Sequence, residues 1–285
     1  MKEKNVHYYP GHMRKAESQL SSYVKLVDLI VEVVDARAPM ASQNPTLSSL
    51  FSGKKRILLL SKSDWADPEV TKKWLEHFQK EGTAAAAGNL KEGKIVNLLK
   101  QCSAPLIAEK RAKEQKLGMK SQPLRLMVVG VPNVGKSTFI NAFKGKGKAK
   151  VGNIAGYTRS EQWIRVSPEF LLLDTPGILP MNYADGRKAV ILALLGTMRE
   201  NVLPTEDLAD ALYGYLKERY PDALQKRFGI AGIRETPFDE ALSFIANKRG
   251  LLEGGVPSPS RAAYLLLKEF KDGLLGPYSL EEPNA

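Results

Sequence analysis

The hydrophobic positions of this chain follow two different periods, and the change between them divides the sequence into two parts. In the first two thirds, short apolar runs rich in Val, Ile and Leu alternate with segments of helical spacing. These runs predict buried strands at 28–36, 56–61, 83–89 and 124–130, and two more within 160–177. Strands that alternate with helices imply the α/β class, with a mixed, mostly parallel sheet covered by helices on both faces.

Beyond Asp185 only amphipathic segments separated by Pro and Gly remain. They predict helices at 186–200, 204–221, 236–250 and 259–273, and no strand. We therefore expect two domains, an α/β domain over 1–183 and a small all-helical domain over 184–285. The charged, poorly patterned stretch 103–122 reads as a helical or extended linker.

The composition limits the cellular location that we expect for the protein. The single cysteine, Cys102, excludes an internal disulfide, and the longest apolar runs are too short to span a bilayer. The first residues lack the apolar core of a signal peptide. These features predict a soluble, cytoplasmic protein with no membrane partner.

The net charge of +11 is concentrated in one part of the chain. Between Lys110 and Arg165 there are 13 lysines and arginines against two acids, so the rest of the chain sums to zero. Such a concentration favours polyanions, either nucleotide phosphates or RNA, although an average charged run is a solvated face. The segment 186–285 has a net charge of −1, so RNA contacts there depend on local patches such as Lys226-Arg227 and Lys248-Arg249.

The stretch GVPNVGKST, Gly130–Thr138, fits the G-x-x-x-x-G-K-[S/T] phosphate-binding pattern. It follows an apolar strand and opens a helix, which is the context that the motif requires. Backbone amides would surround the phosphates, the Lys136 ammonium would neutralise them, and the Ser137 hydroxyl would bind Mg²⁺. The nucleotide-binding residues predicted in this P-loop are Asn133, Val134, Gly135, Lys136, Ser137 and Thr138.

Two later stretches complete a predicted magnesium and γ-phosphate site. DTPG places Asp174 at a strand end, where its carboxylate would hold Mg²⁺, and the Gly177 amide would contact the γ-phosphate. Thr158, in the basic loop before it, would close over Mg²⁺ when GTP is bound, although a lone loop threonine is an ordinary feature. The predicted magnesium ligands are Ser137, Thr158 and Asp174.

The stretch SKSD, at the end of the strand 56–61, supplies a base reader. The Asp64 carboxylate would accept two hydrogen bonds from guanine, which adenine cannot donate, and the Lys62 stem would lie over the purine. An isolated K-x-D is a weak signal, and here it precedes the P-loop by about seventy residues, the reverse of the usual order. Reading the sheet circularly from Leu124 restores a complete GTPase order, which predicts a circularly permuted P-loop domain.

The motifs YYPGHMRKA, VDARAP, KSD, GVPNVGKST, GYT and DTPGI follow one another from about Tyr8, with a helical tail after them. Together they resemble the YlqF/RbgA group of circularly permuted GTPases, which assist assembly of the large ribosomal subunit. The resemblance runs past Gly250 and implies a GTP-hydrolysing switch in late 50S assembly that uses Mg²⁺. It also implies rRNA binding in the GTP state through the helical domain, and slow hydrolysis that the subunit stimulates. We expect a monomer whose partners are GTP, GDP and the large subunit, and not DNA.

Two positions depart from the common GTPase pattern. Ser61 stands where most GTPases have Asn, which removes an amide that ties the base loop to the P-loop and predicts weaker affinity. The loop that contacts the guanine oxygen is expected at Ala87, Gly88 and Asn89, where the common Ser-Ala pair is missing. Only a backbone amide is needed there.

Ile178 follows DTPG where Ras-like GTPases have a water-orienting Gln, so another group must position water. The resemblance implies His12 for this role, although a single His after Pro-Gly is by itself typical of a loop. It further implies that Asn133 helps to bind K⁺ as a second cation. The predicted catalytic residues are His12, Lys136, Thr158 and Gly177.

Two alternatives stay open on the sequence alone. One is an RNA-binding assembly factor that uses nucleotide only as a structural ligand. The other is a translation-linked or tRNA-modification GTPase.

Overall fold

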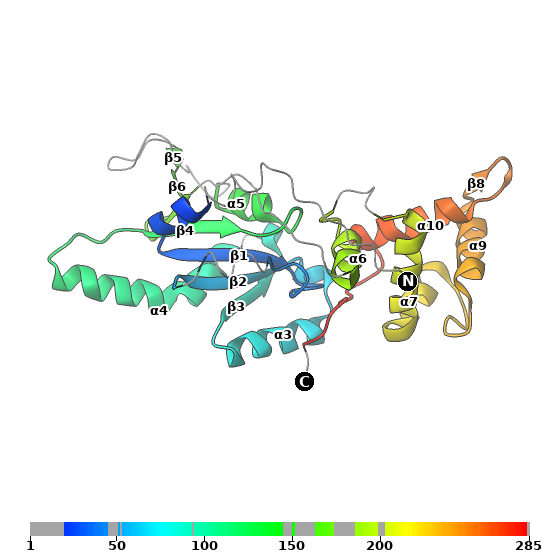
Figure 1. The fold of residues 1–285 in the computed structure, drawn as a ribbon, viewed down its shortest axis with the longest axis horizontal. Coiled ribbons are helices and arrows are strands. Elements are labelled where there is room, and N and C mark those ends of the chain that lie inside the picture. The colour runs from blue at the N-terminus through cyan, green and yellow to red at the C-terminus, as the bar shows by residue number, and fades with distance from the viewer. Residues whose placement is uncertain are drawn as a thin grey trace.

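The computed structural model describes residues 20–44, 51, 53–92, 94–144, 150–151, 163–173, 186–198 and 203–283. In these ranges a seven-stranded sheet lies beside a group of helices (Figure 1). The strand order across the sheet is β3-β2-β1-β4-β7-β6-β5. The strands are β1 (Leu29–Asp35), β2 (Lys55–Ser61), β3 (Ala84–Gly88), β4 (Leu124–Val129), β5 (Lys150–Val151), β6 (Trp163–Arg165) and β7 (Phe170–Leu173).

The sheet is mixed and mostly parallel, as the sequence predicts. Five strands run parallel, and β6 and β5 extend one edge in the antiparallel sense. All seven residues of β1 are buried, which fits a central strand with helices on both faces. Asp35 of β1 pairs with Ser61 of β2, and Ser61 pairs with Gly88 of β3. The carboxyl ends of these three strands therefore meet at one edge of the sheet.

The position of β4 confirms the circularly permuted order. This strand leads into the P-loop and lies at the centre of the sheet, between β1 and β7. The three strands that precede it in the sequence lie on one side, and the three that follow lie on the other. The base-reading strand β2 thus comes earlier in the chain than β4 but lies only two places from it.

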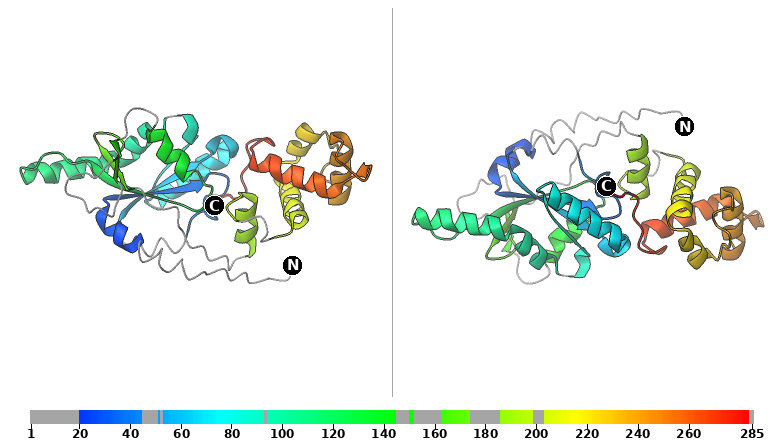
Figure 2. Two further views of the ribbon diagram at one scale, coloured as in Figure 1. Left: turned by 90° about the horizontal axis from the view of Figure 1, so that it is seen from above. Right: turned by 90° about the horizontal axis from the view of Figure 1, so that it is seen from below.

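Alternate residues of the strands face separate hydrophobic cores. Val31 and Val33 of β1 belong to a core that includes residues of α4 (Ile95–Lys116) and α5 (Lys136–Lys144). Ile30 packs with the helical residues 20–26, and Val34 packs with α3 (Pro68–Lys80). Figure 2 shows helices on both sides of the sheet. The 3-10 turns η1 (Ser63–Trp65) and η2 (Leu90–Glu92) follow β2 and β3.

The stretch 103–122, predicted as a helical or extended linker, is helical as far as Lys116. It continues α4 without a break, and Pro105 lies inside the helix. Leu106 and Ile107 pack against the core beneath the helix. Its alanines, lysines and glutamates favour a helix, which explains why a stretch with weak apolar spacing forms one.

The helical part consists of α6 (Gly186–Leu194), α7 (Thr205–Arg219), α8 (Pro221–Phe228), α9 (Phe238–Arg249) and α10 (Pro259–Lys271). Their apolar faces share one core, in which Leu212, Leu216 and Leu266 are fully buried. A short hairpin of β8 (Leu252–Glu253) and β9 (Val256–Pro257) departs from the predicted absence of strands. Strands of two residues leave no apolar run from which to predict them.

The C-terminal segment, residues 274–283, leads from α10 back to the sheet. The amide of Tyr278 donates to the Trp65 carbonyl at 3.0 Å, and the amide of Leu280 donates to the Arg37 carbonyl at 2.7 Å. The Glu281 carboxylate accepts from the backbone amides of Met40 and Ala41. This segment therefore links the helical part to loops at the carboxyl edge of the sheet.

None of the helices in the described ranges combines the length and apolar character needed to cross a bilayer.

Candidate nucleotide-binding site

The P-loop leaves β4 in a path that glycine makes possible. Gly130 has a φ of +150°, and a Cβ at this position would lie 2.3 Å from the carbonyl oxygen of Val33 in the neighbouring strand. Gly135 has a φ of +104°, and its Cβ would come within 3.1 Å of Leu90. Both glycines therefore allow the loop to pass close to other segments before α5 begins at Lys136.

Lys136 lies at the start of α5 with its side chain folded back onto the P-loop. Its Nζ donates to the Val131 carbonyl at 2.6 Å. Burial lowers the pKa of this ammonium from 10.5 to about 8. Because desolvation disfavours the charged form, an anionic group placed beside Lys136 would favour it again. Ser137 follows on the same turn with its side chain exposed, in a position open to a ligand.

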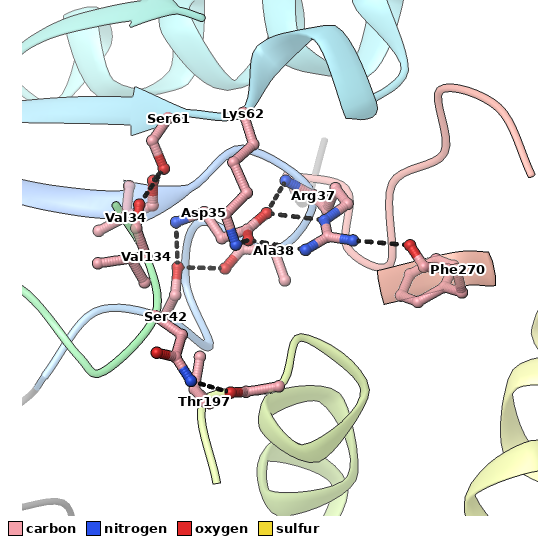
Figure 3. A network of polar contacts seen from close by, with 12 residues as sticks. Val34, Asp35, Arg37, Ala38, Ser42, Ser61, Lys62, Val134, Thr197 and Phe270 are labelled. Carbon is pink, nitrogen blue, oxygen red and sulfur yellow. Dashed lines mark hydrogen bonds and ion pairs between the residues drawn. The ribbon is translucent and has the colours of Figure 1, made fainter. Parts of the chain in front are cut away.

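Ser61, the last residue of β2, joins the base loop to the P-loop. Its Oγ is buried and lies 2.6 Å from the carbonyl oxygen of Val134 and 2.9 Å from that of Val34 (Figure 3). A hydroxyl donates one hydrogen, and the shorter distance favours Val134 as its acceptor. Serine lacks the amide that most GTPases have here, but its hydroxyl ties the base loop to the P-loop in its place. The effect on nucleotide affinity stays a prediction.

The base loop and the P-loop enclose one small hollow of about 80 Å³ at the carboxyl edge of the sheet. It is lined by Lys62, Asp64, Trp65, Asn89, Leu90, Lys91, Val134, Gly135 and Thr138. Six of these residues were predicted from the sequence as nucleotide-binding. Trp65, Leu90 and Lys91 were not, although Trp65 directly follows Asp64, and Leu90 and Lys91 follow Asn89.

Of the three residues expected to form the guanine-oxygen loop, Ala87, Gly88 and Asn89, only Asn89 lines the hollow. Ala87 and Gly88 pair with β2 as part of β3, whereas Asn89 begins the turn that lines the hollow. The Asn89 side chain accepts from the amide of Lys91 at 3.0 Å, which shapes this turn. The backbone next to the hollow is therefore that of Asn89–Lys91.

Asn133 has an unusual backbone conformation and a contact outside the P-loop. Its φ is +60°, and among the described residues Lys62 is the other non-glycine residue with positive φ. The Asn133 Nδ2 donates to the carbonyl oxygen of Gly196, just after α6, at 2.6 Å. The P-loop is thus tied to the helical part as well as to the base loop.

Four predicted residues, His12, Thr158, Asp174 and Gly177, lie outside the described residues. Their roles in magnesium binding and catalysis stay predictions.

Comparison with known proteins agrees with this arrangement. A family model described as "50S ribosome-binding GTPase" matches residues 125–220, which include the P-loop. The chain is 38% identical to ribosome biogenesis GTPase A of Bacillus licheniformis over 98% of each protein. It is also 38% identical to the protein of the same name from Thermotoga maritima, over 97% of this chain and 94% of that one.

A solved structure shows the same fold. The GNP-bound YlqF from T. maritima is 33% identical in sequence, with a TM-score of 0.67 over 95% of this chain and 99% of that one. Three observations lead to the same conclusion. The base loop precedes the P-loop in permuted order, the two loops line one hollow, and the similarity to these proteins covers nearly the whole chain. The chain belongs to the ribosome biogenesis GTPase A (YlqF/RbgA) family of circularly permuted GTPases.

Proposed function

We propose that this chain is a GTP-binding and GTP-hydrolysing switch protein that assists late assembly of the large ribosomal subunit. The observation that carries the proposal is the hollow shared by two loops that lie about seventy residues apart in the sequence. A ligand with both a base and phosphates would use both loops at once. The names of the full-length relatives supply the process, ribosome biogenesis.

The described residues would divide the work between base and phosphates. Asp64 would accept hydrogen bonds from the guanine edge, and the backbone of Asn89–Lys91 would face the guanine oxygen. The amides at the start of α5 would surround the phosphates, and Lys136 would neutralise them. Each role matches the place of the residue in the hollow or beside it.

The residues at the start of α5 fit a magnesium ion. Ser137 presents an exposed hydroxyl oxygen on the first turn, and oxygen ligands are those that Mg²⁺ prefers. When bound, Mg²⁺ neutralises charge on the β- and γ-phosphates. Thr158 and Asp174 are the further ligands that we propose. A potassium ion would use the Asn133 side-chain oxygen, because the amide nitrogen only donates, here to the Gly196 carbonyl.

Hydrolysis would need a group that positions water, and we propose His12 for this role. The protein alone would hydrolyse GTP slowly, and the ribosomal subunit would raise the rate by on the order of 10³–10⁵.

RNA contacts would come from the helical part. Arg227 and Arg249 both pair with Glu269 there, so exposed Lys226 and Lys248 are the stronger candidates for phosphate contacts.

The test measures phosphate release from GTP with and without purified 50S particles, and co-sedimentation with those particles in a non-hydrolysable GTP analogue or in GDP. We expect stimulated hydrolysis, and co-sedimentation mainly with the analogue. Lys136→Ala should remove both effects. Lys72→Ala, which changes an exposed lysine of α3, serves as the matched control.

Other outcomes point to the alternatives. Binding to 50S particles that is equal in both nucleotides, with no turnover, would indicate an assembly factor with a structural nucleotide. Copurification of tRNA with no subunit binding would indicate a GTPase linked to tRNA.

A further inference from the structure

Asp35, the last residue of β1, lies fully buried between the base loop and the helical part. Its Oδ1 accepts from the backbone amide of Arg37 at 3.1 Å and from the Arg37 Nε at 3.0 Å. Its Oδ2 accepts from the Arg37 Nη2 and from the Lys62 Nζ, both at 2.9 Å (Figure 3). One carboxylate therefore holds two cationic side chains in fixed positions.

The Asp35 carboxyl group is deprotonated. Burial alone would raise the pKa of this carboxyl, but the Arg37 guanidinium and the Lys62 ammonium outweigh it and hold the pKa well below its usual range. Asp35 therefore stays anionic at physiological pH. The side chain of Lys62 is 21% exposed and that of Asp35 is fully buried, so the ammonium has a permanent partner that water does not reach.

The backbone of Lys62 is held in a conformation that lysine seldom adopts. Its φ of 54° and ψ of 35° lie in the left-handed region, which is unfavourable for a residue with a Cβ. The Lys62 carbonyl accepts from the amide of Trp65 at 2.9 Å, which closes the η1 turn. Strained residues of this kind persist where the surroundings hold them, and they gather at functional sites.

The fixed lysine forms part of the base pocket. Lys62 lines the hollow together with Asp64 and Trp65, and its Nζ lies 5.7 Å from the centre of the Trp65 ring. Asp35 does not line the hollow, and it holds the Lys62 ammonium. The methylene stem of Lys62 is therefore the part that would face a base.

We propose that Asp35 is a positioning residue for purine recognition: by anchoring the Lys62 ammonium, it makes the Lys62 stem a fixed wall of the base pocket. The proposal rests on the nucleotide site proposed above. It assigns to the first residue of the DAR sequence, 35–37, a role in binding the base and none in binding the phosphates.

The rival explanation is that Asp35 serves only folding, since it also orders Arg37. The two explanations predict different effects of the variants on the binding of GTP and of a ligand that has no base. Binding of GTP and of inorganic tripolyphosphate, both with Mg²⁺, is measured by calorimetry for the parent, Asp35→Asn, Lys62→Met and the double variant. Tripolyphosphate uses the P-loop without a base. Lys91→Met is the matched control, because Lys91 also lines the hollow and lies 6.0 Å from the Trp65 ring.

We expect Asp35→Asn and Lys62→Met each to weaken GTP binding about tenfold while tripolyphosphate affinity changes less than twofold. The double variant should bind GTP within about twofold of either single variant, because both changes remove the same anchor. Asp35→Asn combined with Lys91→Met should instead show additive losses. Additive losses for Asp35→Asn with Lys62→Met, or a parallel fall in tripolyphosphate affinity, would overturn the proposal.

The lysine variants decide the matter if Asp35→Asn does not fold. Lys62→Arg keeps a cation for Asp35 and should retain most of the GTP affinity that Lys62→Met loses. Unchanged GTP binding by Lys62→Met would overturn the proposal by itself. If the parent binds GTP no more tightly than tripolyphosphate, the proposed nucleotide site fails first, and this result is distinct from additive losses in the variants.

Discussion

Asn133 in the P-loop donates a hydrogen bond of 2.6 Å to the carbonyl oxygen of Gly196, the second residue after α6. The two residues are 63 positions apart in the chain. The contact places the end of α6 next to the loop that would hold the nucleotide phosphates. A change in the P-loop on nucleotide binding would therefore reach the helical part directly.

Removal of this contact should loosen the end of α6. Asn133→Ala eliminates one hydrogen bond with a net contribution of about 0.5–1.5 kcal/mol. The amides of Leu195, Gly196 and Thr197, which bond back into α6, should then exchange with solvent about two- to tenfold faster. Native-state hydrogen exchange followed by mass spectrometry measures this.

Asn247→Ala is the control for that experiment. It removes a similar bond of 2.8 Å, from an asparagine amide to the Ser243 carbonyl, within α9. Exchange at 195–197 should not change in this variant. If Asn133→Ala likewise left it unchanged, the contact would have no role in holding α6.

Ser61→Ala should destabilise the protein and weaken GTP binding. The change leaves the buried Val134 carbonyl without its partner, which costs about 1–3 kcal/mol. The Tm should fall by roughly 2–4 °C for each kcal/mol lost. Thermal unfolding and GTP titration measure the two effects, and Ser63→Ala, in the next turn of the same loop, should show neither. Ser61→Asn has no missing tie to restore, so tighter GTP binding by that variant would contradict our interpretation.

Asp64→Asn should shift nucleotide preference from GTP towards XTP. The amide presents a donor where the carboxylate presents an acceptor, and this arrangement suits xanthine. Competition binding with the two nucleotides measures the preference. Asp67→Asn is the matched control, because Asp67 caps α3 by accepting from the amides of Glu69 and Val70. Retained GTP preference in Asp64→Asn would show that the base loop is wrongly assigned.

GTP affinity should fall as the pH rises through the pKa of Lys136. Burial lowers this pKa to about 8, so below pH 8 the free protein already carries the charge that the phosphates need. Above pH 8 binding must take up a proton, and affinity should fall by up to about tenfold per pH unit. Titrations with GTP from pH 7 to pH 9.5 test whether the affinity falls in this direction. Lys136→Arg stays charged throughout, so its curve should lack this component, and identical curves would exclude Lys136 as the titrating group.

The parts of the site that the sequence predicts are those encoded by neighbours in the chain. GVPNVGKST and SKSD each carry their chemistry within a few residues, and the strand before each one places it at the sheet edge. The order of the strands followed from assuming that both motifs serve one ligand. The hollow lined by Asp64 and Gly135 agrees with that assumption.

The parts that the sequence could not predict depend on contacts between distant segments. No local pattern shows that Ser61 reaches Val134, or that Asp35 holds Lys62 across 27 positions. The sequence also did not show that β3 extends through Ala87 and Gly88, because the alanines before Gly88 do not mark where the strand ends. The hairpin of β8 and β9 was missed because its strands are too short to form a pattern.

The C-terminal segment has a consequence for the time at which the protein is completed. The base loop and P-loop have both been synthesised by residue 138, yet Tyr278 and Leu280, which bond to Trp65 and Arg37, follow about 140 residues later. At 5–20 residues per second that interval is on the order of 10 s. A nascent chain would thus display the base loop and the P-loop well before the segment that fastens the helices beside them has been made. The backbone bonds that join the two parts here can therefore form only after Tyr278 and Leu280 have been synthesised.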